Sequence, residues 1–355
     1  MSSSRLPALD FGRGMAALAV VIFHYTFLNE DARLSMPGLA TFTNYGYLGV
    51  HFFFLISGFV IFMTLEKTAS AWDFFAARAS RLYPAFVLSI VLTILFLYIL
   101  QGHVMFSIRD IALNLTMFPG SLGAQKINPA YWTLSFEIIF YGIVFLAILF
   151  RGKNGVLPII TVWFSLSALN AFISLGIIEK ILILKWSPLF TGGAALYLAT
   201  CKSGKSRAAY LALFFITLPF ACHYTLENLA EPRALFDFWQ TQDSILISLI
   251  LTIYLLMAFI AFRPNAMSWL PPKFIEICGG ASYILYLIHE RVGSELITQL
   301  YPLLGNAGVL ITIGLMIGIS SFLYLYFDKP AQRILRTLRT RSTGNISKAR
   351  TGISN

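Results

Sequence analysis

The chain has 355 residues, of which 57% are hydrophobic and 12% are charged, with a net charge of +10. Soluble domains have about 25% charged residues, so the composition argues against a soluble globule and for a chain whose solvent is a lipid bilayer. The three cysteines have no CxxC spacing and the five histidines are scattered, which predicts neither a disulfide framework nor a metal site. We therefore predict an all-α, polytopic bundle of transmembrane helices.

Apolar runs long enough to span a bilayer occur about ten times along the chain. They lie near residues 9–28, 46–65, 82–100, 133–150, 156–175, 186–200, 208–224, 244–262, 277–297 and 307–327. The run at 186–200 is short and the run at 277–297 carries charges, so the count is open by one. We expect a transmembrane domain over residues 1–328 and a basic, disordered tail over 329–355.

The positive charges report the topology of these helices. If the N-terminus is cytoplasmic, the inner segments and the tail together hold 18 of the 26 Lys and Arg residues, and the outer segments hold six. An excess of this size on one side follows the positive-inside rule, and it places both termini in the cytoplasm. The basic balance is therefore explained by topology, and we predict no binding of nucleic acid.

The first helix carries two ionisable residues, Arg13 and His24. Their separation of 11 residues is close to three helical turns, so both side chains point to one side, roughly 16 Å apart along the axis. Ionisable residues within spanning helices mark functional sites by default, and these two could line a path across the membrane. In the alternative interpretation, Arg13 anchors the helix at the surface and His24 is a packing residue.

Glu137 lies about one turn inside the fourth helix, which follows Trp132. An unpaired carboxylate at that depth is costly, so it requires a partner. His24 lies at a comparable depth, and a His–Glu pair gives a base whose tautomer is set by the carboxylate. The alternative is a structural ion pair between two helices. Trp132 is a candidate hydrogen-bond donor at the same site.

Four further groups of polar residues are candidate site residues. Arg78 and Arg81 share one face at the inner start of the third helix, where they suit either phosphate groups of a ligand or lipid phosphates. Ser57 and its neighbour Gly58 allow close approach of a helix or of a ligand chain.

The second and ninth helices hold the remaining candidates. His51 begins the second helix near the outer surface, where it could simply be solvated. Tyr283, Tyr286 and His289 follow one another at i+3 steps, so this face of the ninth helix must line a cavity or the bundle interior.

Five motifs in order resemble the acyltransferase-3 family of membrane acyltransferases. They are Leu9-Asp10 with Arg13-Gly14 and His24, the run Gly49 to Phe59, Arg78-x-x-Arg81-x-x-Pro84, Trp132-Thr133-Leu134-x-x-Glu137-x-x-Phe140-Tyr141, and Ser282-Tyr283-x-x-Tyr286-Leu287-x-His289. The resemblance covers about 9–327. One departure is Glu290-Arg291, where many members have a proline soon after the histidine.

The resemblance implies transfer of an acyl group, most often acetyl, from cytoplasmic acyl-coenzyme A to a sugar hydroxyl. It makes His24 the essential histidine, with Arg13 as its motif partner, and Arg78 and Arg81 the family's double-arginine motif. It implies a multi-pass protein of the bacterial cytoplasmic membrane, with acyl-CoA as co-substrate, no permanently bound cofactor, and exopolysaccharide, lipopolysaccharide or a lipo-oligosaccharide as acceptor. The form of the fourth-helix motif is similar to the exopolysaccharide-modifying branch.

Two other classes of function remain open from the residues. Polar residues in spanning helices also line translocation paths, so a transporter or flippase for a polysaccharide precursor is one alternative. A structural or regulatory subunit of a polysaccharide export complex is another. Release of free coenzyme A from an acyl donor separates an enzyme from both.

Overall fold

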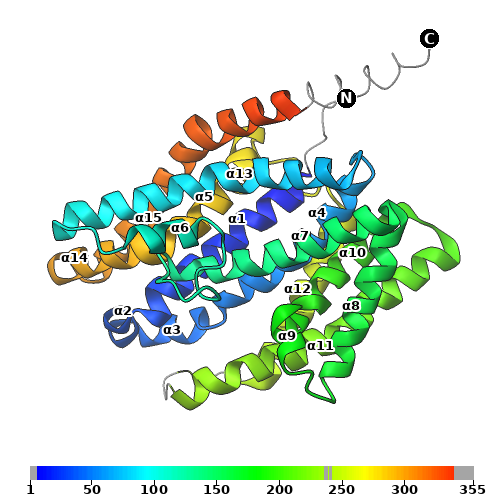
Figure 1. Ribbon diagram of the computed structural model, residues 1–355. Helices are drawn as coiled ribbons and strands as arrows, with labels where there is room; N and C mark the ends of the chain where they lie inside the picture. Colours follow the sequence, from blue (N-terminus) through cyan, green and yellow to red (C-terminus); the bar gives the residue numbers. More distant parts are fainter. Residues whose placement is uncertain (1–5, 236–238, 240–241, 340–355) are drawn as a thin grey trace, which may run out of the picture.

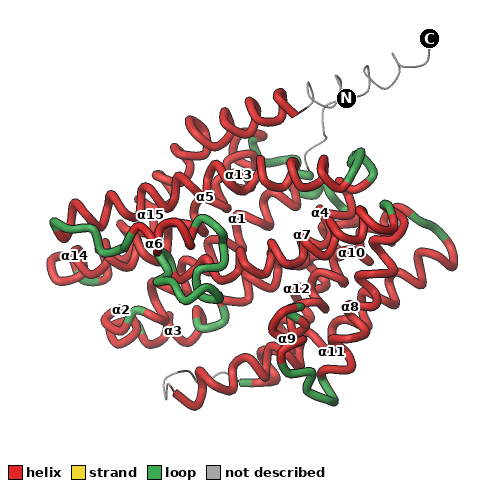
Figure 2. Tube along the Cα trace, in the orientation of Figure 1, coloured by secondary structure: helices red, strands yellow, loops and turns green. Residues whose placement is uncertain are grey.

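The computed structural model describes residues 6–235, 239 and 242–339, and all regular structure in this part of the chain is helical (Figures 1 and 2). Within the described residues, seven helical segments are long and apolar enough to cross a membrane. They are Pro7–Leu28, Pro37–Leu65, Ala71–Gln101, Pro129–Arg151, Gly204–Ala234, Asp243–Phe262 and Asn306–Arg339. The predicted all-α, polytopic membrane fold is therefore confirmed.

Three of the ten expected spans correspond to shorter helices. These are α8 (Val156–Asn170, 15 residues), α10 (Ser187–Cys201, 15 residues) and α13 (Pro272–Ile288, 17 residues). A helix of 15 residues is about 22 Å long, which is less than the hydrocarbon thickness of about 30 Å. The structure thus has helices at all ten expected positions, of which seven combine the length and the apolar composition of a complete span. The helical trace of α13 continues without a break to Leu304 and is therefore not short as a whole.

The centre of the bundle is formed by α1 (Pro7–Ile22), α4 (Gly49–Leu65), α10 and α13; α1 packs against α13 and α4, and α4 packs against α10. Small residues bring α4 and α10 together. A Cβ atom at Gly58 would lie 2.0 Å from the Phe190 carbonyl oxygen, and one at Gly193 would lie 1.9 Å from that of Leu55. Gly58 is therefore a packing residue, as one of the two sequence interpretations proposed.

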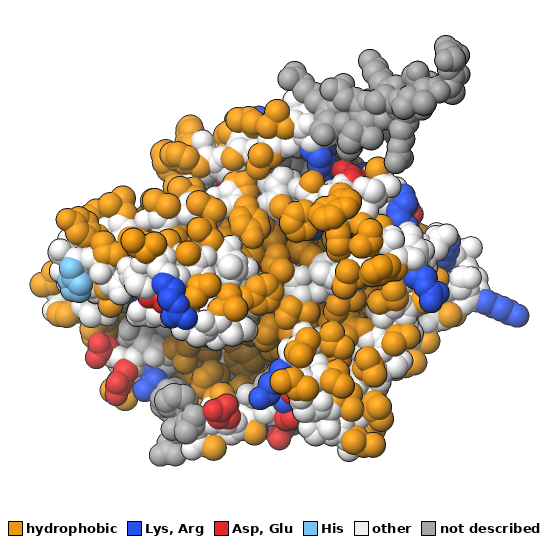
Figure 3. All heavy atoms as spheres, in the orientation of Figure 1, with side chains coloured by type: hydrophobic (Ala, Val, Ile, Leu, Met, Phe, Trp, Pro, Cys, Tyr) orange, Lys and Arg blue, Asp and Glu red, His pale blue; other side chains and the backbone are white. Residues whose placement is uncertain are grey.

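Long helices surround this centre: α5 (Ala71–Gln101), α7 (Trp132–Arg151), α11 (Gly204–Leu235), α12 (Asp243–Phe262) and α15 (Asn306–Leu323). Many of their large apolar side chains are exposed, among them Ile99, Phe259 and Phe322. Figure 3 shows hydrophobic side chains over most of one face, with charged side chains toward its margins. Exposed apolar side chains on this scale mark a surface that contacts lipid.

Short helices close the end of the bundle at which α1 finishes. They include α2 (Glu30–Ser35), α3 (Pro37–Thr43), α6 (Ile108–Asn114), α9 (Ile177–Ile181) and α14 (Ser294–Leu304). The expected helix within 106–118 is α6, which begins with a capping box between Ser107 and Asp110. Hydrogen bonds from Ser107 and from the Gln125 N–H hold the pKa of Asp110 below its ordinary value.

Three segments are wound as π-helix: η1 (Phe23–Leu28), η6 (His289–Gly293) and η7 (Tyr324–Asp328). π-turns are rare and concentrate at functional sites. After η7 the helix continues to Arg339, whose guanidinium lies 3.5 Å from Asp73 on α5. The remainder of the expected tail lies outside the described residues.

Candidate active site

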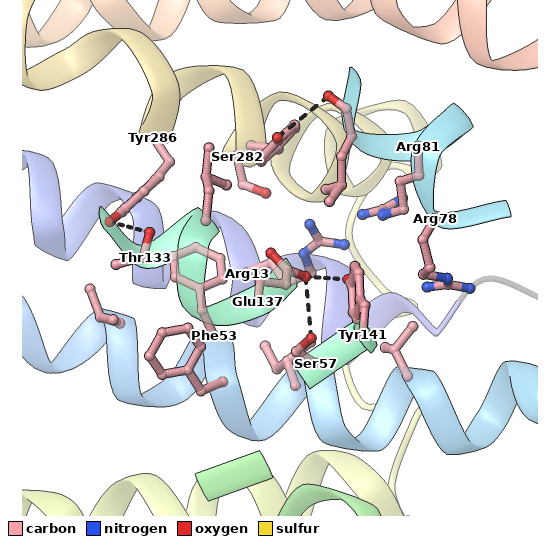
Figure 4. A pocket seen from close by; sticks show the side chains of 17 residues that line it. Arg13, Phe53, Ser57, Arg78, Arg81, Thr133, Glu137, Tyr141, Ser282 and Tyr286 are labelled. Atoms are coloured by element: carbon pink, nitrogen blue, oxygen red, sulfur yellow. Dashed lines mark hydrogen bonds between the residues drawn. The ribbon is translucent and has the colours of Figure 1, made fainter. Parts of the chain in front are cut away.

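The first of two cavities, here called the arginine cavity, lies between α1, α4, α5, α7 and α13 and has a volume of about 90 Å³ (Figure 4). Its polar lining comes from Arg13, Ser57, Arg78, Arg81, Thr133, Glu137, Tyr141, Ser282, Tyr283 and Tyr286. The wall thus contains three guanidinium groups and one carboxylate. The sequence motifs predicted most of these residues, and the fold brings them together.

Glu137 is held by hydroxyl groups within the arginine cavity. Its Oε1 accepts a hydrogen bond from Ser57 Oγ at 3.2 Å and another from the Tyr141 hydroxyl. Figure 4 shows the Arg13 guanidinium beside it. Because a buried carboxylate is stable only when it is hydrogen-bonded and near positive charge, this arrangement explains how Glu137 is tolerated at that depth.

The arginines of this cavity keep unused donors. Arg78 Nη2 donates to Thr64 Oγ1 at 3.0 Å, and its guanidinium lies over the ring of Tyr141 at 5.9 Å from the centroid. The buried Nε atoms of Arg13 and Arg78 have no hydrogen-bond partner. Buried donors are rarely left unsatisfied, so these atoms are suited to an anionic group that enters the cavity.

The second cavity, here called the histidine cavity, has a volume of about 280 Å³. It is lined by Val20, Phe23, His24, Leu28, Tyr47, Val50, His51, Ala130, Trp132, Trp186, Thr225, Asn228, Leu229, Pro232, Trp239, Tyr286 and Glu290. Three tryptophans and two tyrosines form much of this wall. The ring centroids of Trp132 and Trp186 are 5.6 Å apart, and those of Trp239 and Tyr47 are 6.2 Å apart.

The hydrogen bonds of His24 fix the state of its ring. Nδ1 lies 2.8 Å from the carbonyl oxygen of Val20, one turn earlier in the helix. A carbonyl oxygen only accepts hydrogen bonds, so Nδ1 carries the proton and Nε2 of the neutral ring keeps a free lone pair. Glu290 Oε2 is 3.9 Å from Nε2. A free Nε2 in a cavity wall has the arrangement that a general base needs.

Both members of this pair lie on π-turns. His24 is in η1, and Glu290 is in η6, where the Tyr25 hydroxyl donates to the His289 carbonyl oxygen at 2.7 Å. That contact requires a glycine, because a Cβ atom at Gly293 would lie 1.6 Å from the Tyr25 hydroxyl oxygen. The extra residue of a π-turn changes which side chains share a face, and it turns Glu290 into the cavity.

His289 packs against the ring of His24. Its ring centroid is 4.8 Å from that of His24, and its Nδ1 lies 2.7 Å from the Tyr286 carbonyl oxygen. His289 is fully buried and does not line either cavity. The expectation that His289 lines the substrate cavity is therefore corrected to a position in the next layer of residues.

His51 lies in a cavity wall, as its place among the candidate site residues implied, and it is not solvated. Only 3% of its surface is exposed, and Nε2 lies 2.8 Å from Thr225 Oγ1 on α11. The sequence allowed a solvated histidine at the start of the helix, but α11 continues to Leu235 and covers that position. His51 thus belongs to the wall of the histidine cavity.

The two cavities share part of their walls. Val50 and Tyr286 line both, and Tyr286 is the shared residue with a polar group. The Tyr286 hydroxyl accepts a hydrogen bond from Thr133 Oγ1 at 2.9 Å and donates to the Ala130 carbonyl oxygen at 3.3 Å. Val50 and Tyr286 therefore stand between the arginine cavity and the cavity that holds His24.

The expected pairing of His24 with Glu137 is wrong. Glu137 bonds within the arginine cavity, and the carboxylate nearest the His24 ring belongs to Glu290. Helical depth alone cannot distinguish these acids, because it does not say which helices are neighbours. Trp186 and Trp239 were missed as well, since nothing in their local sequence links them to α1.

Comparison with known proteins gives the family of the chain. A family model described as an acyltransferase domain matches residues 6–325. A protein of the Acidianus two-tailed virus, whose name gives acetyltransferase as an inferred activity, is 25% identical over 85% of each chain. The O-acetyl transferase of Shigella phage Sf6 is 30% identical over 46% of this chain and 52% of its own length.

A further relative is the exopolysaccharide production protein ExoZ of Rhizobium meliloti, which is 31% identical over 33% of this chain and 38% of its own length. The matches to ExoZ and to the phage enzyme thus span about half of those relatives or less. No solved structure matches the chain. The family model covers nearly all of the membrane domain, and the chain accordingly belongs to the acyltransferase-3 family and is a membrane-embedded acyltransferase.

Proposed function

We propose that the protein is an O-acyltransferase, most specifically an O-acetyltransferase, that moves an acyl group from acyl-CoA to a hydroxyl group of a cell-surface or secreted carbohydrate. The observation that carries this proposal is the pair of neighbouring cavities that share Val50 and Tyr286 in their walls. One cavity has the charge that a phosphorylated donor requires, and the other presents a histidine with a free lone pair.

The donor would enter at the arginine cavity. The phosphates of coenzyme A suit the guanidinium groups of Arg78 and Arg81, which lie on adjacent turns of α5. From there the pantetheine arm would extend past Arg13 toward Tyr286. Because Lys and Arg concentrate at this end, we place it in the cytoplasm and the protein in a bacterial cytoplasmic membrane.

The acyl transfer would occur at the junction of the cavities. His24 Nε2 takes the proton of an acceptor hydroxyl, whose oxygen attacks the thioester carbonyl. The tetrahedral intermediate then collapses, the carbon–sulfur bond breaks, and His24 returns the proton to the leaving thiolate. The products are an ester and free coenzyme A. In this scheme Nδ1 stays bonded to the Val20 carbonyl, which keeps Nε2 directed at the reaction.

Tyr286 is the candidate for stabilising the oxyanion. It is the residue with a hydroxyl group in both cavity walls, and its bond to the Ala130 carbonyl oxygen is long at 3.3 Å. Its proton could therefore turn to the developing oxyanion, which is the arrangement that lowers the barrier of acyl transfer. Glu137 would act at a distance by holding Tyr141 and balancing the charge of Arg13.

The acceptor is proposed from two lines of support. The printed names of relatives concern O-acetyl transfer and exopolysaccharide production. The histidine cavity has aromatic rings and a carboxylate, which can pack against the C–H faces and bond the hydroxyl groups of a sugar.

The test is a coupled measurement on purified protein. Acetyl-CoA is added with the surface polysaccharide of a deletion strain, free coenzyme A is measured as thiol, and the ester is detected by NMR. We expect both signals with the wild type and neither with His24→Gln. The control is His103→Gln, which changes an exposed histidine far from both cavities. Thiol release without an ester rules out a carbohydrate acceptor, and no thiol release favours a transporter.

A further inference from the structure

The histidine cavity has an unusual balance of charge. No Lys or Arg contributes to its wall as far as the chain is described, and Glu290 is its one carboxylate. Arg233 beside the wall lies 2.7 Å from Asp243. Arg291, whose Nε donates to the Ile127 carbonyl oxygen at 3.3 Å, and Lys126 act on the charge of Glu290 from outside the wall. The arginine cavity is the reverse, with three guanidinium groups and one carboxylate.

This balance disfavours an acidic acceptor. The Glu290 side chain is 22% exposed and the His24 side chain 17%, so both are largely shielded from water. A sugar carboxylate beside them would place a second anion near Glu290, whose charge the nearby cations Arg291 and Lys126 already compensate from outside the cavity wall. Like charges in a partly buried site repel strongly because water screens them poorly.

A sugar with only hydroxyl groups fits the same atoms. His24 Nε2 and Glu290 Oε2 are 3.9 Å apart and are both acceptors. Adjacent hydroxyl groups of a pyranose can each donate to one of them at ordinary hydrogen-bond lengths of about 2.8 Å. The hydroxyl on Nε2 is then the one that reacts, and its neighbour on Glu290 determines the position of the ring.

We infer that the acceptor is a sugar residue without an acidic group, and that Glu290 is the specificity-determining and positioning residue that selects it. This inference rests on the acyl transfer proposed above, and it adds the class of sugar.

The experiment compares two matched acceptors, methyl glucopyranoside and the corresponding methyl glucuronoside, which differ by one carboxylate. Binding is followed by tryptophan fluorescence, because Trp132, Trp186 and Trp239 line the cavity. Transfer from acetyl-CoA is followed as kcat/KM. We expect the wild type to favour the neutral glycoside at least tenfold in both measurements. Glu290→Gln should reduce this preference to about threefold by improving the acidic glycoside.

Two further variants serve as controls for the Glu290→Gln result. Glu295→Gln makes the same charge change on α14, where the side chain contacts Gln299 outside the cavity, and it should leave the preference at its wild-type value. Asn228→Lys adds a cation to the cavity wall, and it should raise binding of the glucuronoside at least threefold even if Glu290→Gln folds poorly.

The outcomes separate the inference from the proposed function. If the wild type acylates both glycosides equally, or if Glu290→Gln and Asn228→Lys leave the preference unchanged, the inference is wrong while acyl transfer stands. If the neutral glycoside binds selectively but no ester forms with any acceptor, the selection stands and the transfer function is wrong. If neither glycoside binds or reacts, the cavity does not hold a sugar residue of this size and the inference falls.

Discussion

The two cavities lie end to end along α1 yet differ in size, charge and the origin of their residues. The arginine cavity is small and built largely from residues that the sequence motifs contain, including Arg13, Arg81 and Glu137. The histidine cavity is three times larger in volume, at about 280 Å³ against about 90 Å³, and takes Trp186, Trp239 and Glu290 from elsewhere in the chain. Such a difference is expected if the arginine cavity binds the acyl donor that the family has in common and the histidine cavity binds an acceptor that differs from one member to another.

The largest expected effect is on the base. His24→Gln keeps a polar side chain of similar size and removes the free Nε2 lone pair. General-base catalysis contributes about 10²- to 10⁴-fold, so we expect kcat to fall by at least about 10²-fold with the KM for acetyl-CoA within about twofold of the wild type. Steady-state kinetics on purified protein measure both. If the variant retains a tenth of the wild-type kcat, His24 is not the general base.

The second largest effect on kcat is expected at Tyr286, which lines both cavities. Tyr286→Phe removes one hydroxyl group and leaves the ring in place. Loss of an oxyanion donor costs about 10²- to 10³-fold in kcat, and we expect a decrease of that order for both good and poor acceptors. Thr133→Val is the matched control, because it removes the group that bonds the Tyr286 hydroxyl but not the hydroxyl itself. If the two variants lose the same activity, Tyr286 acts through packing.

A smaller effect is expected on KM, and it should show which of the two substrates each cavity binds. Arg81→Lys keeps the charge and loses the planar pair of donors, and a charge-assisted hydrogen bond contributes about 1.5–3 kcal/mol. We expect the KM for acetyl-CoA to rise about tenfold or more while the KM for the acceptor stays unchanged. Trp186→Leu should show the opposite pattern. The comparison between the cavities fails if either variant raises both KM values equally.

The smallest effect concerns acyl length. Val50 lines both cavities together with Tyr286, so Val50→Ala should enlarge the space between them and admit a longer acyl group. One methylene group in an apolar pocket changes discrimination by about 1 kcal/mol, which predicts a several-fold gain for propionyl-CoA relative to acetyl-CoA. Ile56→Val, in the arginine cavity alone, is the control and should leave the ratio within about twofold. An unchanged ratio in Val50→Ala would place the acyl group elsewhere.

The sequence alone predicted the positions of the helices and most polar residues of the arginine cavity. The spacing of Arg13 and His24 predicted that both side chains face the bundle interior, and each of them lines a cavity, although η1 begins one residue before His24. A continuous path between them stays a prediction. The sequence could not identify the partner of His24. The choice between Glu137 and Glu290 depends on which helices are neighbours and on the π-turn η6, which an ideal helical period does not describe.

The most direct test of the two-ended path is sidedness in reconstituted vesicles. Cys201 is exposed at the end of α10 opposite Trp186 and the histidine cavity, so a membrane-impermeant maleimide identifies the vesicles in which this end faces outward. With acceptor sealed inside these vesicles and acetyl-CoA outside, we predict that esters form within the lumen. If esters form only when acetyl-CoA is supplied from the histidine side, the donor does not enter at the arginine cavity and the account is contradicted.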